Sequence, residues 1–359
     1  MTQSTNPHAI SGLKSDALLA ILREHFDADA VWSRRGMVMA RGRPVHLDLQ
    51  QIELLKRALA DGGWSARSER AGQDWLLMIE RRKDWRPPWL ALTLFLATVV
   101  AVVFLRPLTL TGFSLEGFRE VFFTELPFAY TLFPILLAHE FGHYFAARAH
   151  DYPASLPYFI PGFYPFGTFG AIIVARYPFR DRRVLFDIAV AGPLAGFLVS
   201  IPVLWYGLAH SEWVHLPESG GLYLGDPLLM KLLVTWALPA PPEAGMDILL
   251  HAAAFGGWAG LFVTMLNLLP FGPLDGGKTA YAMFPGRQKW IAWGFWGVLA
   301  TSLLYSYFWM LWLCLTLVFR LPHPPTLNDE VPIGRRRALI GVAVLAVFVL
   351  SFMPFPFKM

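Results

Sequence analysis

The chain has 359 residues, of which 55% are hydrophobic and 15% aromatic, and its formal net charge is +4. This composition is too apolar for an ordinary soluble protein and predicts a polytopic α-helical membrane protein. The basic residues gather where apolar segments end, as at 81–86 and 335–337, so they indicate membrane topology and argue against nucleic-acid binding. We therefore expect the lipid bilayer as a partner, and no nucleic acid.

Residues 1–86 are far more polar than the rest and are predicted to form a small soluble α+β domain. Apolar periodicity predicts two helices and three strands, at 17–26 and 49–59 and near 31–32, 37–39 and 75–79. No catalytic constellation stands in this region, so we expect a cytosolic recognition or regulatory module. Residues 87–359 are expected to form the membrane-embedded domain.

Apolar segments of residues 87–359 predict about seven transmembrane helices. They lie at 89–105, 127–147, 184–208, 249–269, twice within 290–319, and at 338–352. One helix over 290–319 would be about 45 Å long, against a hydrocarbon core of about 30 Å. We therefore predict two short helices with a turn near 305–307. Asp187, near the start of the third span, is interpreted as a helix-end cap and not as a ligand.

The stretch 151–183 is too rich in proline, glycine and aromatic residues for a helix. Extended strands and turns are expected there, especially around 166–174. Non-helical backbone this apolar survives near a bilayer only when it packs inside protein or lines a wet cavity. We predict a re-entrant, β-hairpin-like segment beside an active site.

The second span contains the motif His139-Glu140-Phe141-Gly142-His143, which has the H-E-x-x-H pattern. Two histidines four residues apart lie on one helical face and can share a metal, and the glutamate between them can act on water. An ionisable residue at the centre of a membrane helix costs about 2.5 to 3.5 kcal/mol on insertion scales. A glutamate beside two histidines at such a position is therefore unexpected unless the group binds a metal.

A catalytic zinc keeps three protein ligands and one open position, so the two histidines need a third partner. Asp275 is the best candidate, because it stands in a glycine-rich turn after the fourth span, although a plain Asp-Gly turn is the alternative. His251 starts that span, roughly 24 Å along the helix from Asn267, and is expected at the membrane interface.

The positive-inside rule places basic clusters on the cytosolic side, and a topology with seven spans puts all of them there. These clusters lie at 81–86, 176–183, 278–289 and 335–337. Both chemical motifs then approach the cytosolic face at similar depth. We expect a multi-pass protein of the cell (inner) membrane, with its N-terminus and active-site opening on the cytosolic side.

With these motifs the sequence resembles the site-2 protease family of intramembrane zinc metalloproteases. The matching segments are H-E-F-G-H at 139–143, G-T-F-G-A at 167–171, G-P-L-A-G at 192–196 and N-L-L-P-F-G-P-L-D-G-G at 267–277. The resemblance covers about 126–281, the catalytic core. No segment has the character of an inserted PDZ domain or of appended CBS domains, so regulation by those modules is not expected.

The resemblance implies one zinc ion held by His139, His143 and Asp275, with Glu140 as general base and proton shuttle. Asn267 matches the asparagine of the family's second motif and would hold substrate or the developing oxyanion. The implied activity is hydrolysis of a peptide bond within or near a transmembrane segment of a membrane-protein substrate, as in regulated intramembrane proteolysis.

The resemblance also gives the hairpin a role in substrate binding. Its residues Gly167, Thr168, Phe169 and Gly170 would present an edge to an unwound substrate strand. Unwinding is needed because a helical substrate hides its carbonyl groups.

Two other functions fit parts of the pattern. A metal-binding membrane chaperone or scaffold without proteolytic activity would keep the ligands, but the intact Glu140 speaks against it, because a structural site needs no base. A metal transporter should carry acidic or histidine residues along several spans, and the spans offer little of that beyond Glu140, Asp187 and the ligands.

Overall fold

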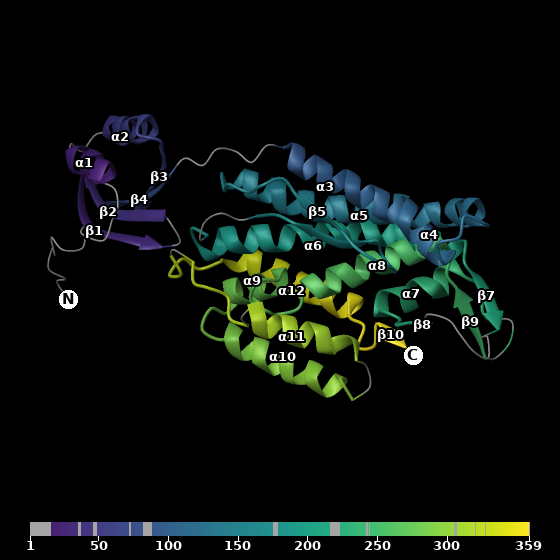
Figure 1. Cartoon of the computed structure of the whole chain (residues 1–359). Helices are drawn as coiled ribbons and strands as arrows, with labels where there is room; N and C mark the ends of the chain where they lie inside the picture. The colour runs from purple at the N-terminus through teal and green to yellow at the C-terminus, as the bar shows by residue number, and fades with distance from the viewer. Residues whose placement is uncertain are drawn as a thin grey trace. The chain divides into compact units, whose positions relative to one another are not determined.

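The computed structural model describes residues 16–34, 37–45, 49–71, 73–81, 88–174, 179–215, 223–241, 243, 245–304, 307–319, 321–326 and 328–358 (Figure 1). The chain divides into two compact units, Met1–Pro87 and Pro88–Met359. The first unit is a small α+β domain and the second is mostly helical.

The N-terminal unit is built on an antiparallel sheet with the strand order β1-β2-β4-β3. Its elements are α1 (Asp16–His25), β1 (Phe26–Arg34), β2 (Met37–Pro44), α2 (Leu49–Asp61), β3 (Trp64–Ala71) and β4 (Asp74–Arg81). Leu22 of α1, Leu55 of α2 and Leu77 of β4 belong to one buried apolar cluster, which unites both helices with the sheet. The two predicted helices are therefore present.

Strand β3 was not predicted, because its sequence W-S-A-R-S-E-R-A lacks the apolar alternation that marks a half-buried strand. It lies at the edge of the sheet and pairs only with β4, an environment that accepts polar residues.

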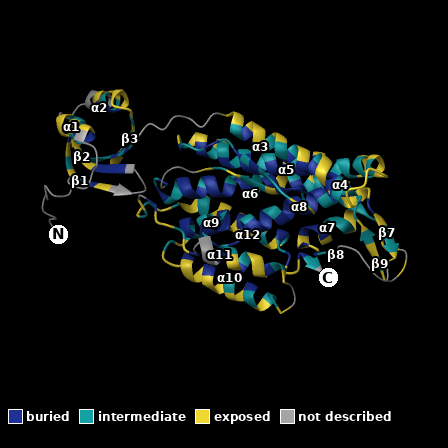
Figure 2. Cartoon of the chain, viewed as in Figure 1, coloured by how far each residue is buried: buried dark blue, intermediate teal, exposed yellow. Residues whose placement is uncertain are grey.

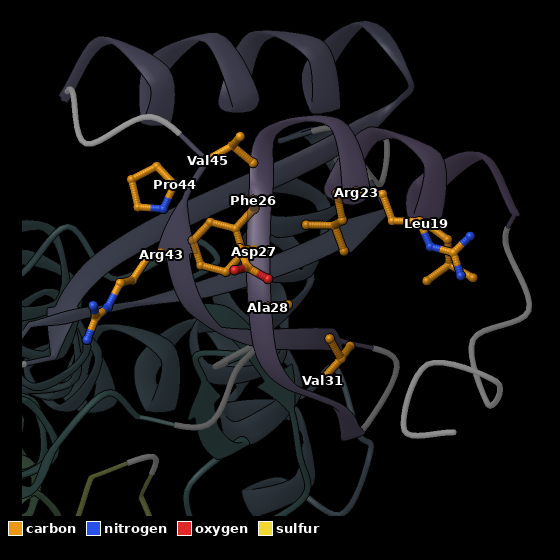
Figure 3. Close-up of a pocket in the computed structure, with 10 residues that line it drawn as sticks. Leu19, Arg23, Phe26, Asp27, Ala28, Val31, Arg43, Pro44 and Val45 are labelled. Atoms are coloured by element: carbon orange, nitrogen blue, oxygen red, sulfur yellow. The ribbon is translucent and has the colours of Figure 1, made fainter. Parts of the chain in front are cut away.

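A pocket of about 520 Å³ lies beside α1, β1 and the end of β2, with Leu19, Phe26 and Val45 in its wall (Figure 3).

The second unit, Pro88–Met359, holds the candidate membrane spans and is called the membrane unit below. It begins with one continuous helical run, α3 (Trp89–Val100), the π-helical η2 (Ala101–Leu105) and α4 (Arg106–Leu110). The remaining helices are α5 (Phe118–Ala149), α6 (Arg182–Ala209), α7 (Leu228–Ala237), α8 (Ala252–Asn267), α9 (Asp275–Met283), α10 (Gln288–Ser302), α11 (Phe308–Phe319) and α12 (Arg335–Ser351).

Within the described ranges, three helical runs are long and apolar enough to cross a membrane: Trp89–Leu110, Phe118–Ala149 and Arg182–Ala209. The other four predicted spans correspond to shorter helices, with 16 residues in α8, 15 in α10, 12 in α11 and 17 in α12. The predicted break within 290–319 is confirmed, because α10 ends at Ser302 and α11 begins at Phe308.

The predicted hairpin is present as β5 (Tyr158–Pro161) and β6 (Thr168–Ile172), which pair antiparallel. Two further strand pairs occur, β7 (Glu212–His215) with β9 (Met246–Leu249), and β8 (Tyr223–Leu224) with β10 (Phe357–Lys358). Of these, only the β5–β6 hairpin was expected from the sequence.

Helices α5, α6 and α8 pack against one another at the centre of the membrane unit. Glycine permits the close approach: a Cβ on Gly142 of α5 would lie 2.6 Å from the Ala191 carbonyl oxygen of α6, and one on Gly257 of α8 would lie 2.8 Å from Leu204 Cα of α6. Figure 2 shows buried residues along α6 and α8 and exposed ones on α3 and α10. The buried centre of this unit is therefore the three-helix contact.

The interpretation of Asp187 as a helix-end cap is wrong. Asp181 is the N-cap of α6 and accepts hydrogen bonds from the backbone amides of Arg183, at 2.8 Å, and Val184, at 3.1 Å. Asp187 lies inside the helix, where its carboxylate accepts two hydrogen bonds of 2.7 Å from Arg337 of α12 and lies 2.9 Å from Nε2 of His150, just after α5. It ties three segments together.

Candidate metal centre

Three buried side chains meet where α5 passes the start of α9. His139 and His143 project from α5, and Asp275 is the first residue of α9. They are 3%, 9% and 5% exposed. One potential ligand atom from each lies within 4.8 Å of the other two. The three residues predicted as metal ligands are thus brought together by the fold.

The spacing of these atoms fits a zinc ion. The two histidine Nε2 atoms are 3.2 Å apart, and Asp275 Oδ2 lies 3.0 Å from His143 Nε2 and 3.5 Å from His139 Nε2. Ligand atoms on neighbouring corners of a tetrahedron with bonds of about 2.0 to 2.1 Å are about 3.3 Å apart. The triangle therefore has the size that three corners of a zinc tetrahedron require.

The orientation of the His143 ring is set from α6. Its Nδ1 lies 2.7 Å from the carbonyl oxygen of Ile188. Because a carbonyl oxygen only accepts hydrogen bonds, Nδ1 carries the proton, and the lone pair of Nε2 faces Asp275 and His139. This is the second contact that a metal-binding imidazole requires.

Two glycines of the G-P-L-A-G motif make room for the imidazole rings. A Cβ on Gly192 would overlap the ring of His143, and one on Gly196 would lie 3.2 Å from Cβ of His139 and 3.3 Å from its Nδ1. These glycines allow α6 to lie directly against the two histidines.

The turn that carries Asp275 folds back onto the chain before it. A Cβ on Gly276 would overlap the Leu268 carbonyl oxygen, and one on Gly277 that of Phe271. Lys278, one helical turn later, places its Nζ 2.9 Å from Asp275 Oδ1, which leaves Oδ2 for the histidines. Lys278 was not predicted as part of the site. Its spacing of i, i+3 from Asp275 is the signal that could have found it.

A buried glutamine holds the same turn from the other side. Gln288, only 1% exposed, donates from Nε2 to the carbonyl oxygens of Pro270, at 3.2 Å, and Leu321, at 3.1 Å. Its Oε1 accepts from the backbone amide of His323 at 3.1 Å. All its partners are main-chain atoms, which could be any residue type, so nothing in the sequence indicated this role.

The remaining sequence candidates divide into near and distant ones. Glu140 follows His139 on α5 and is 7% exposed. Asn267, the last residue of α8, has its Nδ2 3.4 Å from His139 Nε2 and so reaches the cluster. His251 caps the opposite end of α8, where its Nδ1 accepts from the Ala253 amide at 3.2 Å. It is not part of the cluster.

The four hairpin candidates are not among the three residues that form the cluster. Gly167, with φ +74°, approaches the backbone of Val102 in η2, and Thr168 Oγ1 donates to the Ile160 carbonyl oxygen at 2.9 Å. Phe169 is 68% exposed, and Gly170 has φ +88° with open space where a Cβ would stand. Gly167 and Thr168 are buried, and only Phe169 of the four is exposed.

Comparisons with known proteins agree with this geometry. Residues 127–292 match the sequence model of peptidase family M50. The chain is 34% identical over 240 residues to "Probable zinc metalloprotease EGY1, chloroplastic" of Arabidopsis thaliana, covering 64% of this chain and 43% of that protein. It is 30% identical over 296 residues to "Probable zinc metalloprotease EGY2, chloroplastic" of Oryza sativa subsp. indica, covering 76% and 51%.

These matches cover only part of the related proteins. The chain spans about half the length of the curated relatives that it matches. No solved structure matches it.

Proposed function

We propose that this chain belongs to peptidase family M50, the site-2 protease family, and is an intramembrane zinc metalloprotease. It hydrolyses a peptide bond within or near a transmembrane segment of a membrane-protein substrate. The observation that carries this proposal is the triangle of His139, His143 and Asp275, closed to 3.0–3.5 Å beside Glu140 in a helix apolar enough to cross a membrane.

One zinc ion held by His139, His143 and Asp275 supplies, when bound, Lewis-acid activation of water for attack on a carbonyl carbon. Glu140 takes the proton from the attacking water and returns it to the nitrogen of the leaving amine. The hydrogen bond from His143 to Ile188 and the ion pair from Lys278 to Asp275 keep the ligand atoms aimed at one point.

Asn267 and the hairpin supply the substrate contacts in this proposal. The Asn267 amide, 3.4 Å from His139 Nε2, donates to the substrate carbonyl as negative charge develops there. The hairpin residues Gly167, Thr168, Phe169 and Gly170 lie at and beside the β6 edge that receives the unwound substrate strand.

The proposed topology has seven spans. Three are the long apolar helices, and the other four are α8, α10, α11 and α12, each shorter than the roughly 20 residues of a full span. Large apolar side chains are exposed on the outer helices, as at Trp293, Met310 and Leu345, and fit contact with lipid. The short helices then depend on their neighbours to fill the bilayer thickness.

The orientation follows from the basic clusters, which the positive-inside rule places in the cytosol. Residues 1–86 then form a cytosolic recognition or regulatory module, and 87–359 form the protease with its core at 126–281. Helix α5 runs toward the cytosol, and His143 lies six residues, about 9 Å, from its end at Ala149. Water reaches the centre from that side. The host membrane in this proposal is the inner cell membrane.

The test compares purified wild type with Glu140→Gln on a transmembrane substrate, with zinc content measured for both. We expect the variant to keep its zinc and to cleave about 10²- to 10⁴-fold more slowly than wild type, which is the usual contribution of a general base. Cleavage at the wild-type rate by a zinc-loaded variant would remove Glu140 from the mechanism. If the wild type itself cleaves no transmembrane substrate, the scaffold function replaces the protease.

A second variant addresses the ligand set. Asp275→Ala removes one corner of the triangle, so we expect its zinc content to fall well below that of wild type at equal protein concentration. The matched control is Asp247→Ala, which changes a carboxylate on β9, away from the cluster. Unchanged zinc in Asp275→Ala would exclude it as a ligand.

A further inference from the structure

A buried arginine stands inside the first membrane-spanning run, far along the chain from the metal cluster. The Arg106 side chain is 5% exposed and forms an ion pair with Glu125 of α5. Its guanidinium carbon lies 4.1 Å from the ring centroid of Phe128 and 5.4 Å from that of Phe255. A charge inside a membrane helix is costly and marks a functional position until shown otherwise.

The directional contact of Arg106 is with the hairpin. Its Nε donates a hydrogen bond of 2.7 Å to the carbonyl oxygen of Pro165, in the turn between β5 and β6. The turn is closed by two backbone bonds, from Gly162 N to Gly167 O at 2.9 Å and from Gly167 N to Phe163 O at 2.8 Å. Arg106 therefore binds a turn whose conformation is already defined by backbone hydrogen bonds.

A second contact presses the same turn onto the first span. A Cβ on Gly167 would lie 2.9 Å from Val102 Cα and 3.1 Å from the Ala101 carbonyl oxygen. Both atoms belong to η2, the π-helical turn just before Arg106. Single π-helical turns inside α-helices are frequent at functional sites. The turn is thus seated between backbone at 101–102 and the guanidinium at 106.

The aromatic ring contacts of the hairpin are apolar and do not fix its height. Phe159 of β5 meets Phe95 of α3 edge to face, with centroids 5.2 Å apart, and Phe166 lies against Phe255 and Phe262 of α8. Apolar contacts are non-directional, so a strand held by them alone can shift along its neighbours. A hydrogen bond to one carbonyl oxygen specifies a position.

We propose that Arg106 is a positioning residue that fixes the depth of the β5–β6 hairpin in the membrane. Glu125 neutralises the guanidinium, and Nε holds Pro165, so that the β6 edge meets a substrate strand at one height. This inference rests on the proposed protease function for its effect on substrate. Apolar residues could fill the same space without the cost of burying a charge; only a fork of donors pairs with Glu125 and Pro165 together.

The test uses Arg106→Lys in the full chain, which keeps the positive charge but replaces the planar fork of donor nitrogens with a single nitrogen. We expect about tenfold faster hydrogen exchange at 158–172, the size of one lost hydrogen bond, with α5, α6 and α8 unchanged. Zinc content stays at the wild-type level. On a transmembrane substrate KM rises about tenfold while kcat changes less. Arg119→Lys, on the exposed start of α5, is the matched control.

A second variant displaces the turn from its other partner. Gly167→Ala cannot seat against Val102, and we expect the same rise in hairpin exchange and in KM with zinc retained. Gly112→Ala is its control, since Gly112 also has a positive φ, of 62°, but has open space at the Cβ position. This control separates backbone strain from displacement of the hairpin.

The outcomes are distinct. Wild-type exchange at 158–172 in both Arg106→Lys and Gly167→Ala overturns the anchor, and so does loss of zinc with uniformly faster exchange, which would make Arg106 a general folding residue. Faster hairpin exchange with unchanged KM also overturns the positioning role. The exchange measurement needs no substrate, so a wild type that cleaves nothing refutes the protease function without deciding the anchor.

Discussion

The two units of this chain place their charges in opposite ways. In the N-terminal unit the interior is apolar, with Leu55 and Leu77 fully buried, and the charges pair at the surface, as Arg43 does with Asp74. In the membrane unit exposed side chains are often apolar, while Arg106 and Asp275 are buried. Each of these buried charges has named partners. Stability in the first unit therefore depends on packing, and chemistry in the second depends on precise polar contacts.

Of the substitutions that test this difference between the units, the largest effect on stability is expected in the apolar core of the N-terminal unit. Leu77→Ala in β4 leaves a cavity and should lower the free energy of unfolding of this unit by about 2 to 5 kcal/mol. Hydrogen exchange of residues 16–81 in the full chain measures this loss. Leu54→Ala, at a position 47% exposed on α2, is the control and should change little.

Zinc content decides whether the two units are independent. We expect Leu77→Ala to keep full zinc, because its cavity lies in a separate compact unit. Zinc loss in step with unfolding of residues 16–81 would show that the metal centre depends on the N-terminal unit. The two units would then not be independent.

A smaller effect is expected from a single methyl group beside the metal ligands. Gly192→Ala places a Cβ where the His143 ring stands, so the ring must move away from Asp275. Disturbing the support of a metal ligand typically costs 10- to 100-fold in affinity, and we expect a loss of about that size. Zinc titration against a competing chelator measures it.

The control for this change is Gly297→Ala on α10, where no atom lies within 4 Å of the added Cβ. It should bind zinc as wild type does and can gain slightly in helix stability. Equal zinc affinity in Gly192→Ala and Gly297→Ala would contradict the close fit of α6 against the histidines.

The smallest effect is expected at the surface pair of the N-terminal unit. The hydrogen bond from Arg43, helped by Arg41, holds the pKa of Asp74 below its ordinary value of 3.8. Because the folded state lowers this pKa, the pair contributes stability above pH 3.8, and the contribution is lost as the pH falls through the lowered value. Exposed pairs contribute little, so the change is small.

The measurement is the pH dependence of hydrogen exchange in residues 16–81 for wild type and Asp74→Asn. The variant should show a flatter dependence as the pH falls below about 3.8. An identical slope in both proteins would mean that the pair contributes nothing measurable, and the surface charges of this unit would then be irrelevant to its stability.

Prediction from sequence succeeded where a motif or a local pattern marks the residues, as at His139, His143 and Asp275, and failed where nothing in the surrounding sequence marks the contact. The break between α10 and α11 followed from helix length alone. Strand β3 was missed because an edge strand needs no apolar alternation. Asp187 was assigned to a cap because its distant partner Arg337, on α12, leaves no trace in the local sequence. Each failure concerns a contact that composition around the residue does not encode.

The sequence by itself determined the membrane class, the hairpin and the spacing of His139, Glu140 and His143, because these depend on hydropathy and on the period of one helix. Only the tertiary structure decided that Gly192 stands against His143, that Gln288 clamps the turn of Asp275, and that Arg106 grips the hairpin. Those contacts join backbone atoms to side chains across helices, and a main-chain carbonyl has the same chemistry in every residue.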